Sequence, residues 1–293
     1  MTRSGFVALA GRPNAGKSTL VNRIVGDKVA IVSDKPQTTR RQVRGIATTH
    51  EWQLVLIDLP GVQRPRDSLT ERMQHRVEQT LRDADAVLFV VNGAERIGPG
   101  DRFIARAIEK SGRPAVVAVN KIDRLDRART VNALEGAAAL GIGDDIFPTS
   151  AKTGRGLEAL TTHLAAMLPE GPYLYPPEDT TDMSEEVALA ELIREQVLLR
   201  TRDELPHAVE VVIEEMEERP DGSRVVRALV WAETESQKGI LIGAGGQMIK
   251  AIGSAARREM TRAGGRPVHL DLRVRVRRGW RRDDGLLDRL GIE

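Results

Sequence analysis

Hydrophobic and polar positions follow two different rhythms along this chain. Up to about residue 170, short apolar runs rich in β-branched residues alternate with segments whose apolar positions recur at helical spacing. The apolar runs predict strands over residues 6–10, 43–49, 52–58, 86–92, 115–120 and 145–148. The amphipathic segments predict helices over residues 17–25, 68–82, 100–111, 130–140 and 156–168. This alternation favours an α/β domain with a mostly parallel, doubly wound sheet.

One pair of these strands needs a different connection. Only His50 and Glu51 separate the second predicted strand from the third. Two residues can close a hairpin, whereas a parallel crossover needs about a dozen residues or more. We therefore expect this pair to be antiparallel.

A proline-rich, polar stretch divides the chain. Proline cannot continue a helix, and the prolines at 169, 172, 176 and 177 are followed by polar residues up to 182, which is typical of a linker. Beyond it, helices are predicted over 184–201 and 246–262, and strands over 208–215, 224–233 and 268–277. The sequence therefore predicts a first domain over residues 1–172, a linker over 173–183 and a small α+β domain over 184–293.

Composition narrows the possible classes. Cysteine is absent, which excludes disulfides and thiolate sites. No stretch approaches the roughly 18 apolar residues of a membrane span, and residues 6–10 are too short for a signal-peptide core. The net charge is only +2, but it is unevenly distributed. Residues 184–237 carry 6 basic and 14 acidic side chains, whereas residues 238–282 carry 12 basic and 2 acidic ones.

A phosphate-binding motif, GxxxxGK[ST], occupies residues 11–18 between a predicted strand and a predicted helix. Glycines let backbone N–H groups surround phosphates, and a helix N-terminus favours negative charge. Lys17 is expected to reach the β- and γ-phosphates, and the Ser18 hydroxyl to bind Mg²⁺. The alternative is a glycine-rich turn without a ligand. The predicted phosphate-binding residues are Gly11, Arg12, Pro13, Asn14, Ala15, Gly16, Lys17, Ser18, Thr19, Asp58 and Gly61.

The strand over 52–58 ends in the sequence Asp58-Leu-Pro-Gly61, which suits a phosphate switch. Asp58 is expected to hold Mg²⁺ through water, and the Gly61 N–H to contact the γ-phosphate and respond to its loss. Thr38 and Thr39 lie in the loop before the second strand, and a hydroxyl there can complete Mg²⁺ coordination. Both are candidates, and Thr39 is preferred. The predicted Mg²⁺ ligands are thus Ser18, Thr39 and Asp58, and the predicted switch residues are Thr38, Thr39 and Val62.

Two further motifs select the base. Asn120-Lys-Ile-Asp123 follows an apolar strand, and the Asp123 carboxylate can accept from guanine N1–H and N2–H₂ together, a donor pair that adenine lacks. Lys121 would cover the base, Asn120 would tie loops together, and the Ala151 N–H would face guanine O6. The predicted guanine-binding residues are Asn120, Lys121, Asp123, Ser150, Ala151 and Lys152. Four elements in this order indicate GTP as the substrate of a GTPase.

The residue after Gly61 is Val62, which can neither donate nor accept a hydrogen bond and so cannot orient the attacking water. We therefore expect slow intrinsic hydrolysis, with the water positioned from elsewhere or by a partner.

The second domain carries a candidate RNA-binding surface. Gly243-Ala-Gly-Gly246 is a GxxG loop between an apolar segment and a helix, typical of a KH fold, which clamps about four nucleotides of single-stranded RNA. The alternative is an ordinary turn at a helix N-terminus with solvated charge around it. Ile240, Ile242 and Ile249 are expected to form an apolar floor, and the arginines to neutralise phosphates. The predicted RNA-binding residues are Lys238, Ile240, Ile242, Gly243, Ala244, Gly245, Gly246, Lys250, Arg257, Arg258, Arg273, Arg275 and Arg277.

These motifs together give the chain its resemblance to a known family. Residues 11–18, 37–40, 58–61, 120–123 and 150–152, followed by the segments 193–195 and 203–206, resemble those of the bacterial Era-type GTPases over nearly the whole chain. The resemblance implies a GTPase domain followed by a type II KH domain. It also implies binding near the 3′ end of 16S ribosomal RNA and a role in assembly of the small (30S) ribosomal subunit. A cytoplasmic monomer with peripheral contact at the inner face of the cell membrane is expected, and DNA is not an expected partner.

The resemblance implies one further cofactor, and the chain departs from the family pattern at two positions. In the wider group an asparagine at the position of Asn14 helps to hold K⁺ beside the phosphates. The family usually has Thr where this chain has Leu59, and Lys where it has Ala244, so one RNA phosphate contact is in doubt.

Three functions remain open at this point. The first is a switch in which GTP hydrolysis gates RNA binding, with residues 156–177 expected to transmit the change between domains. The second is an RNA-binding module in which the nucleotide is structural. The third is a GTPase recruited to anionic lipid through the basic face.

Overall fold

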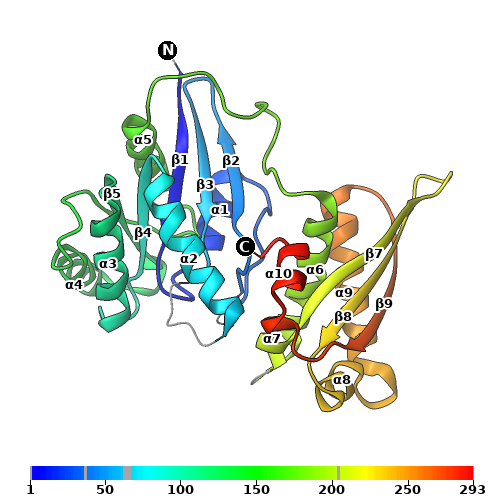
Figure 1. Ribbon diagram of the computed structural model, residues 1–293. Coiled ribbons are helices and arrows are strands. Elements are labelled where there is room, and N and C mark those ends of the chain that lie inside the picture. The colour runs from blue at the N-terminus through cyan, green and yellow to red at the C-terminus, as the bar shows by residue number, and fades with distance from the viewer. Residues whose placement is uncertain (1, 36–37, 62–66, 203–204, 293) are drawn as a thin grey trace.

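The computed structural model describes residues 2–35, 38–61, 67–202 and 205–292. In these ranges the chain forms two β-sheets, each with its own helices, and the two halves lie side by side (Figure 1). The first half is the predicted α/β domain and the second is the predicted small α+β domain. No helix in the described ranges is long and apolar enough to cross a membrane.

The larger sheet has the strand order β2-β3-β1-β4-β5-β6 in the described part of the chain. β2 pairs with β3 in antiparallel fashion, and the remaining neighbours pair in parallel, which confirms the expected hairpin and the doubly wound sheet. The carboxyl ends of the parallel strands therefore meet at one edge, where ligands bind in folds of this type. The strands are β1 (Arg3–Ala10), β2 (Val43–Thr48), β3 (Trp52–Asp58), β4 (Ala86–Asn92), β5 (Ala115–Asn120) and β6 (Ile146–Pro148).

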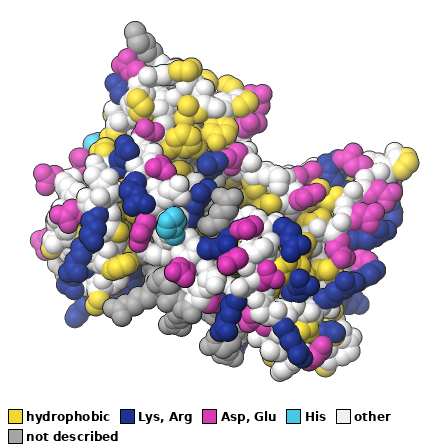
Figure 2. All heavy atoms as spheres, viewed as in Figure 1, with side chains coloured by type: hydrophobic (Ala, Val, Ile, Leu, Met, Phe, Trp, Pro, Cys, Tyr) yellow, Lys and Arg dark blue, Asp and Glu magenta, His cyan; other side chains and the backbone are white. Residues whose placement is uncertain are grey.

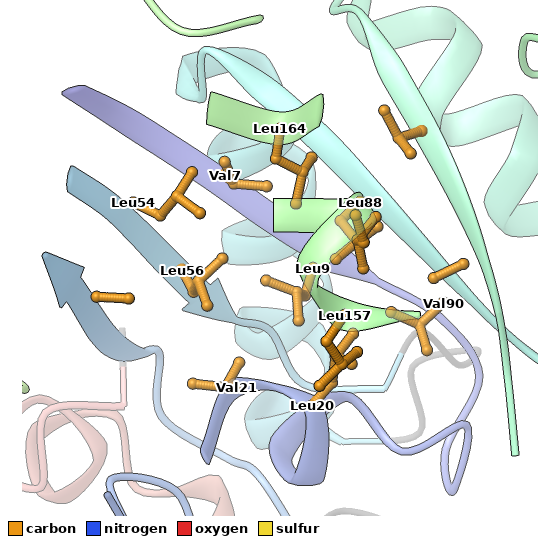
Figure 3. Close-up of a cluster of buried hydrophobic side chains, with 14 of the residues drawn as sticks. Val7, Leu9, Leu20, Val21, Leu54, Leu56, Leu88, Val90, Leu157 and Leu164 are labelled. Atoms are coloured by element: carbon orange, nitrogen blue, oxygen red, sulfur yellow. The ribbon is translucent and has the colours of Figure 1, made fainter. Parts of the chain in front are cut away.

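Helices cover both faces of this sheet. Leu9, Leu20, Leu56 and Leu164 belong to a buried cluster on one face (Figure 3), and Phe89 belongs to a second cluster on the other. Because the strands are buried on both faces, they appear in the sequence as continuous apolar runs. The helices are α1 (Lys17–Val25) and α5 (Leu157–Met167) on the first face, and α2 (Ser68–Asp83), α3 (Pro99–Ser111) and α4 (Arg127–Ala138) on the second.

The smaller sheet has the order β7-β8-β9 within the described ranges, with an antiparallel β7–β8 pair and a parallel β8–β9 pair. Val226 and Val230 of β8 and Leu272 of β9 point to one face, where they meet the helices in a common core. The elements of this half are α6 (Glu185–Arg200), α7 (Leu205–Ala208), β7 (Glu210–Glu218), β8 (Arg224–Ala232), α8 (Glu235–Ile242), α9 (Gln247–Gly264), β9 (Val268–Val276) and α10 (Asp284–Arg289).

The sequence prediction omitted the helices α7, α8 and α10 of the described ranges and shifted the bounds of other elements. The apolar segment expected before the GxxG loop lies in α8, a helix that Thr234 and Gln237 start with a capping box. α4 begins at Arg127 rather than at residue 130, because the Asp126 side chain accepts the Arg129 N–H and caps the helix. β7 begins two residues later than predicted and extends to Glu218, pairing with β8 around a bulge.

The predicted linker runs along the edge of the larger sheet. The Leu174 N–H donates to Gln53 Oε1 at 2.7 Å, and Gln53 Nε2 donates to the Tyr175 carbonyl at 2.9 Å. The Ile46 N–H of β2 donates to the Thr180 carbonyl at 2.8 Å. These residues therefore satisfy backbone groups of the edge strand instead of forming a free spacer.

The two halves also share an apolar contact. Leu69 and Met73 of α2 pack in one buried cluster with Trp280, Leu286 and Ile292 from the C-terminal part of the chain. α2 thus connects the nucleotide-binding half with the last helix of the smaller domain. Continuous packing of this kind transmits displacements, because a close-packed interior deforms little.

Candidate functional site

The phosphate loop joins β1 to α1. Gly16 has φ 99° at the N-terminus of α1, and a Cβ there would lie 2.4 Å from Asn120 Nδ2. Only glycine therefore fits this position. Asn14 adopts φ 62°, a strained conformation for a residue with a side chain, which is typical of functional loops. The loop is thus shaped for close approach of a ligand to backbone N–H groups.

Lys17 lies under this loop. Its Nζ donates to the Gly11 carbonyl at 3.1 Å and to the Arg12 carbonyl at 3.3 Å, so these carbonyls accept hydrogen bonds that phosphate oxygens could accept instead. Burial lowers the pKa of the Lys17 ammonium, against the opposing attraction of Asp58. A buried ammonium bonded to backbone carbonyls provides a strong site for an anion.

Ser18, Thr39 and Asp58 come together although they are far apart in the sequence. Asp58 Oδ2 accepts from Ser18 Oγ at 2.6 Å and from Thr39 Oγ1 at 3.1 Å, and the two hydroxyls are 3.3 Å apart. Burial raises the pKa of Asp58, while Lys17 and the two hydroxyls act in the opposite direction. Asp58 Oδ1 is buried without a hydrogen-bond partner in the described ranges. Two hydroxyls and a carboxylate with a vacant oxygen fit the oxygen ligands that Mg²⁺ prefers.

The side chains of Pro13 and Arg12, two further residues of the phosphate loop, lie in different places. Pro13 lies close to Gly61, since a Cβ on Gly61 would be 2.8 Å from Pro13 Cγ. The Arg12 side chain instead pairs with Asp101 and Glu95, each at 3.2 Å, so only its backbone faces the loop. An open pocket is lined by Pro13, Asn14, Gly16, Lys17, Ser18, Thr19, Thr38, Thr39 and Gly61, with three further residues of the preceding loop.

The guanine motifs lie beside the phosphate loop and are bonded to it. Asn120 Nδ2 donates to the Ala15 carbonyl at 3.0 Å, and Asn120 Oδ1 accepts the Ala151 N–H at 2.9 Å. Lys121 Nζ donates to the Asn14 carbonyl at 2.5 Å. Asn120 therefore ties together the three loops, as the sequence predicts.

Asp123 and Ser150 complete this group. Asp123 Oδ1 accepts from Ser150 Oγ at 2.6 Å, which orients the carboxylate. Lys152 is exposed at the end of the same motif. None of these residues lines the phosphate pocket, so the base and the phosphates would occupy separate parts of the site. Val62 and Gln37 lie outside the described residues.

The loop that carries Thr38 and Thr39 is bonded to the smaller domain. Arg40 is fully buried, and its guanidinium donates to Glu210 Oε2 at 2.9 Å and to the Pro206 carbonyl at 3.1 Å. It also lies 5.4 Å from the ring centroid of Trp280. Arg41 pairs with Glu191 at 2.7 Å and with Glu210 at 3.2 Å.

Arg40 and Glu210 are both ionised, because each lies beside opposite charge. Burial lowers the pKa of Arg40 to about 10, against the opposing effect of Glu210. Burial alone would raise the pKa of Glu210, but the charges of Arg41 and Arg40 outweigh it and lower that pKa to about 2. The Arg40–Glu210 pair is therefore charged at neutral pH, and both side chains are buried.

Sequence reasoning missed this contact. Glu191, Arg194, Glu195 and Gln196 are buried in α6, where a helix of a small domain would normally place apolar side chains. Charged residues on every side of an apolar helix were the available signal. It indicates that charged partners, here from the first domain, surround the helix.

The GxxG loop joins α8 to α9. Gly243 has φ 73°, and a Cβ there would lie 2.8 Å from Met248 Cβ and 2.9 Å from its nitrogen. Gly245 and Gly246 have φ 57° and 78°, but a Cβ at either would meet no described atom within 4 Å. Ala244 is exposed beside them. The loop thus presents open backbone at the N-terminus of a long helix, which favours phosphate.

Other predicted RNA-binding residues surround this loop. Ile240 is 53% exposed, a large apolar side chain open to a ligand, whereas Ile242 and Ile249 are partly covered. Lys238 pairs with Glu235 at 3.7 Å, and Lys250 is exposed on α9. Arg257 and Arg258 are exposed further along the same helix.

The expected single basic patch is instead divided. Leu272 and Val274 of β9 face the helices, so Arg273 and Arg275 lie on the opposite face of the sheet from α9. Arg277 follows the strand, and its guanidinium lies 5.9 Å from the ring centroid of Trp231. Figure 2 shows basic side chains gathering in the region of β8 and β9. Alternation along β9 therefore places Arg273 and Arg275 on the face away from the helices.

The fold and the site define a class: a P-loop GTP-binding protein with a C-terminal KH domain. Comparison with known families agrees. Residues 6–121 match the family described as 50S ribosome-binding GTPase, and residues 204–281 match the KH domain.

Relatives match along almost the entire chain. The GTPase Era of a Nocardioides species is 47% identical, covering 99% of this chain and 96% of the relative. The GTPase Era of Heliobacterium modesticaldum is 40% identical, covering 99% and 97%. The chain therefore belongs to the Era family of GTPases, and it binds and hydrolyses GTP.

Solved structures agree with this assignment. A single-residue variant of Aquifex aeolicus Era bound to GDP and AlF4⁻ is 34% identical, with a TM-score of 0.95 and 99% of each chain covered. Era in complex with MgGDPNP and nucleotides 1506–1542 of 16S ribosomal RNA is also 34% identical, with a TM-score of 0.95 over 100% of this chain and 99% of that one.

Proposed function

We propose that this GTPase is a nucleotide-driven switch that binds single-stranded RNA near the 3′ end of 16S ribosomal RNA and assists assembly of the small (30S) ribosomal subunit. One observation carries the proposal: the loop that places Thr39 beside Ser18 and Asp58 is bonded directly to α6 of the KH domain. The Era structure with MgGDPNP and 16S RNA supports the choice of RNA. The contact also offers a shorter route between the domains than residues 156–177.

The test compares RNA affinity in two nucleotide states. A fluorescent RNA with the 3′-terminal 16S sequence is titrated with the protein in GDP and in a non-hydrolysable GTP analogue, each with Mg²⁺. We expect at least about tenfold tighter binding in one state than in the other, which corresponds to a coupling of about 1.4 kcal/mol. A scrambled RNA and a DNA of the same sequence are the controls. Equal affinities in both states would favour an RNA-binding module with a structural nucleotide.

We also propose roles for the residues of the nucleotide site, and the geometry supports them. We assign the phosphates to the backbone of residues 11–19 with Lys17 and Gly61, and the guanine to Asn120, Lys121, Asp123 and residues 150–152. Mg²⁺ would be held by Ser18, Thr39 and Asp58, with nucleotide phosphates completing its coordination. No group of three His, Cys, Asp or Glu side chains in the described ranges could hold a metal alone. Mg²⁺ would supply charge stabilisation at the transferred phosphoryl group.

K⁺ is a second proposed cation. The Asn14 Nδ2 donates to the Asp34 carbonyl at 2.6 Å, which leaves the side-chain oxygen as the atom able to bind a cation. Replacing K⁺ by Na⁺ at constant ionic strength is expected to slow hydrolysis in the unmodified protein and to have little effect in Asn14→Ala. Equal rates in the two salts would remove K⁺ from the site.

RNA contacts are proposed for both basic surfaces. The GxxG loop, Ile240, Lys238, Lys250 and residues 257–258 would bind the single strand. Arg273, Arg275 and Arg277 would contact phosphates of a longer RNA on the other face of the sheet. The proposed domain limits are residues 1–172, 173–183 and 184–293, and the packing of residues 174–181 against β2 and β3 supports a short, fixed connection.

Cellular placement is also part of the proposal. We propose a cytoplasmic monomer with peripheral contact at the inner face of the cell membrane, supported by the exposed arginines of β9. Sedimentation with vesicles of anionic phospholipid tests the membrane contact, and the 16S RNA fragment serves as competitor. Loss of vesicle binding in Arg273→Ala would support this surface, and absence of binding by the unmodified protein would exclude it.

A further inference from the structure

We propose that Arg194, in helix α6 of the KH domain, is a positioning residue for GTP hydrolysis. It holds the backbone of Thr38 and thereby keeps the neighbouring Thr39 hydroxyl at the Mg²⁺ site. The inference rests on the proposed Mg²⁺ role of Thr39. It goes beyond that role because it makes a side chain of the RNA-binding domain a working part of the GTPase site.

The first observation is the Arg194 contact itself. The guanidinium is fully buried, and its Nη2 donates to the Thr38 carbonyl. The same group is held in place by Glu191, which accepts from Nε at 2.9 Å and from Nη2 at 2.5 Å. A planar guanidinium bound to both carboxylate oxygens has a fixed orientation, so the Thr38 carbonyl meets a rigid donor.

The second observation is that α6 also holds the start of the same loop. Glu195 Oε1 accepts the Val32 N–H at 2.9 Å, and Glu195 Oε2 accepts from Lys28 Nζ at 2.5 Å. Arg194 holds the end of the loop and Glu195 holds its beginning. One turn of a KH-domain helix therefore determines the span within which Thr39 must lie.

The third observation connects the loop to the chemistry. Thr39 Oγ1 is 3.1 Å from Asp58 Oδ2 and 3.3 Å from Ser18 Oγ, the two other proposed Mg²⁺ ligands. Within the loop, Thr38 Oγ1 donates to the Lys35 carbonyl at 2.6 Å. Displacing the Thr38 carbonyl would therefore move Thr38, which is bonded to Lys35, together with the Thr39 hydroxyl. The reaction rate falls when a catalytic group is displaced by about 1 Å.

Loss of Arg194 is expected to affect the GTP-bound and GDP-bound states differently. If Thr39 binds Mg²⁺ beside the γ-phosphate, as proposed, losing Arg194 should affect hydrolysis and its Mg²⁺ requirement while sparing GDP binding. Losing the hydrogen bond from a charged group should lower the rate by about tenfold or more.

The experiment measures single-turnover GTP hydrolysis by the full chain as a function of Mg²⁺ concentration. Arg194→Met is expected to lower the rate by about tenfold or more and to raise the Mg²⁺ concentration at half-maximal rate. Arg194→Lys, which can still donate to the Thr38 carbonyl but cannot pair with both Glu191 oxygens, should recover part of the loss. Arg200→Met is the matched control, because Arg200 lies on the same helix and bonds only to Gln196 in the described part of the chain.

A double-mutant cycle with Thr39→Ala separates this inference from the proposed function. If Arg194 acts through Thr39, the combined variant should be no slower than Thr39→Ala alone. Additive losses would overturn the positioning role, as would an unchanged rate and Mg²⁺ dependence in Arg194→Met. If Thr39→Ala hydrolyses GTP normally, the proposed Mg²⁺ role of Thr39 fails instead. GDP affinity and thermal unfolding of each variant show whether a loss reflects the site or the fold, and an Arg194→Met that binds GDP less tightly or unfolds earlier contradicts the inference.

Discussion

The nucleotide site and the GxxG surface differ in how their residues are held. Each predicted guanine-binding side chain from Asn120 to Ser150 has a hydrogen bond to another loop of the site or to a neighbour within it. Around the GxxG loop, by contrast, Ile240 and Lys250 are exposed to solvent, and Gly245 and Gly246 face open space. The first site is preorganised for one ligand, whereas the second offers open backbone and exposed charge to a flexible chain.

This difference predicts how the two sites respond to substitution. A preorganised polar site fails sharply when one group is changed, because the remaining groups keep a geometry that no longer matches the ligand. An open, charged surface loses affinity in small steps, since each phosphate contact contributes separately.

The largest effect is expected for Asp123→Asn. The amide cannot accept both guanine hydrogens but can donate to a xanthine oxygen, so the preference for GTP over XTP should fall by about 10⁴. Calorimetric titration of both proteins with GTP and with XTP measures it. Unchanged GTP affinity would remove Asp123 from the base pocket.

Lys17→Ala is expected to have the next largest effect. It removes a buried ammonium whose present partners are two backbone carbonyls, and two charge-assisted contacts to phosphate contribute roughly 3 kcal/mol or more. We expect GTP affinity to fall by at least about a hundredfold in calorimetry. The exposed Lys110 gives a matched control, and a Lys17→Ala protein that binds like the Lys110→Ala protein would contradict the assignment.

Acid should loosen the contact between the two domains. Because the pKa of Glu210 is lowered from 4.5 to about 2, its stabilisation is complete above about pH 5 and is lost as the pH falls from about 4.5 towards 2. The loss should be on the order of 3 kcal/mol, measured from urea unfolding at several pH values. Glu210→Gln should be less stable at neutral pH and show less dependence on acid. If the two proteins lose stability in parallel, the Arg40–Glu210 contact is not the source.

The smallest effect is expected within the GxxG loop, where two glycines differ in backbone conformation. Gly243→Ala should lower stability by about 1–2 kcal/mol, because φ 73° with ψ 171° is a region essentially restricted to glycine and Met248 blocks the new Cβ. Gly245 has φ 57° and ψ 22°, in the left-handed helical region with open space around it, so the loss in Gly245→Ala should be smaller. Thermal unfolding compares them. Equal losses would show that neither ψ nor Met248 adds to the cost of a positive φ.

The nucleotide site could be predicted from sequence because its residues lie in short motifs at strand ends. A parallel sheet brings those ends together at one edge, so Lys17, Asp58 and Asp123 had to be near one another. The strands and most helices could be predicted for a similar reason, since the hydrophobic period and the length of a segment are local properties of the sequence. The helix α8 was missed because its apolar segment is too short for periodicity to distinguish a helix from a strand.

The contact between the domains could not be predicted in the same way. Arg40 and Glu210 are separated by 170 residues, and no local pattern in either segment indicates which distant residue it will contact. The side of β9 to which Arg273 points was equally hidden, because alternation defines two faces without saying which one the helices cover. Long-range pairing and handedness of packing are properties of the whole fold.

Amide hydrogen exchange at Val32 tests the central claim most directly, because this N–H belongs to the nucleotide-binding half and its acceptor, Glu195, belongs to the KH domain. Exchange is compared in saturating GDP and in a saturating non-hydrolysable GTP analogue with Mg²⁺. Coupling through the loop predicts slower exchange with the analogue, and loss of that difference in Arg194→Met. Identical exchange in the two nucleotide states of the unmodified protein would contradict it.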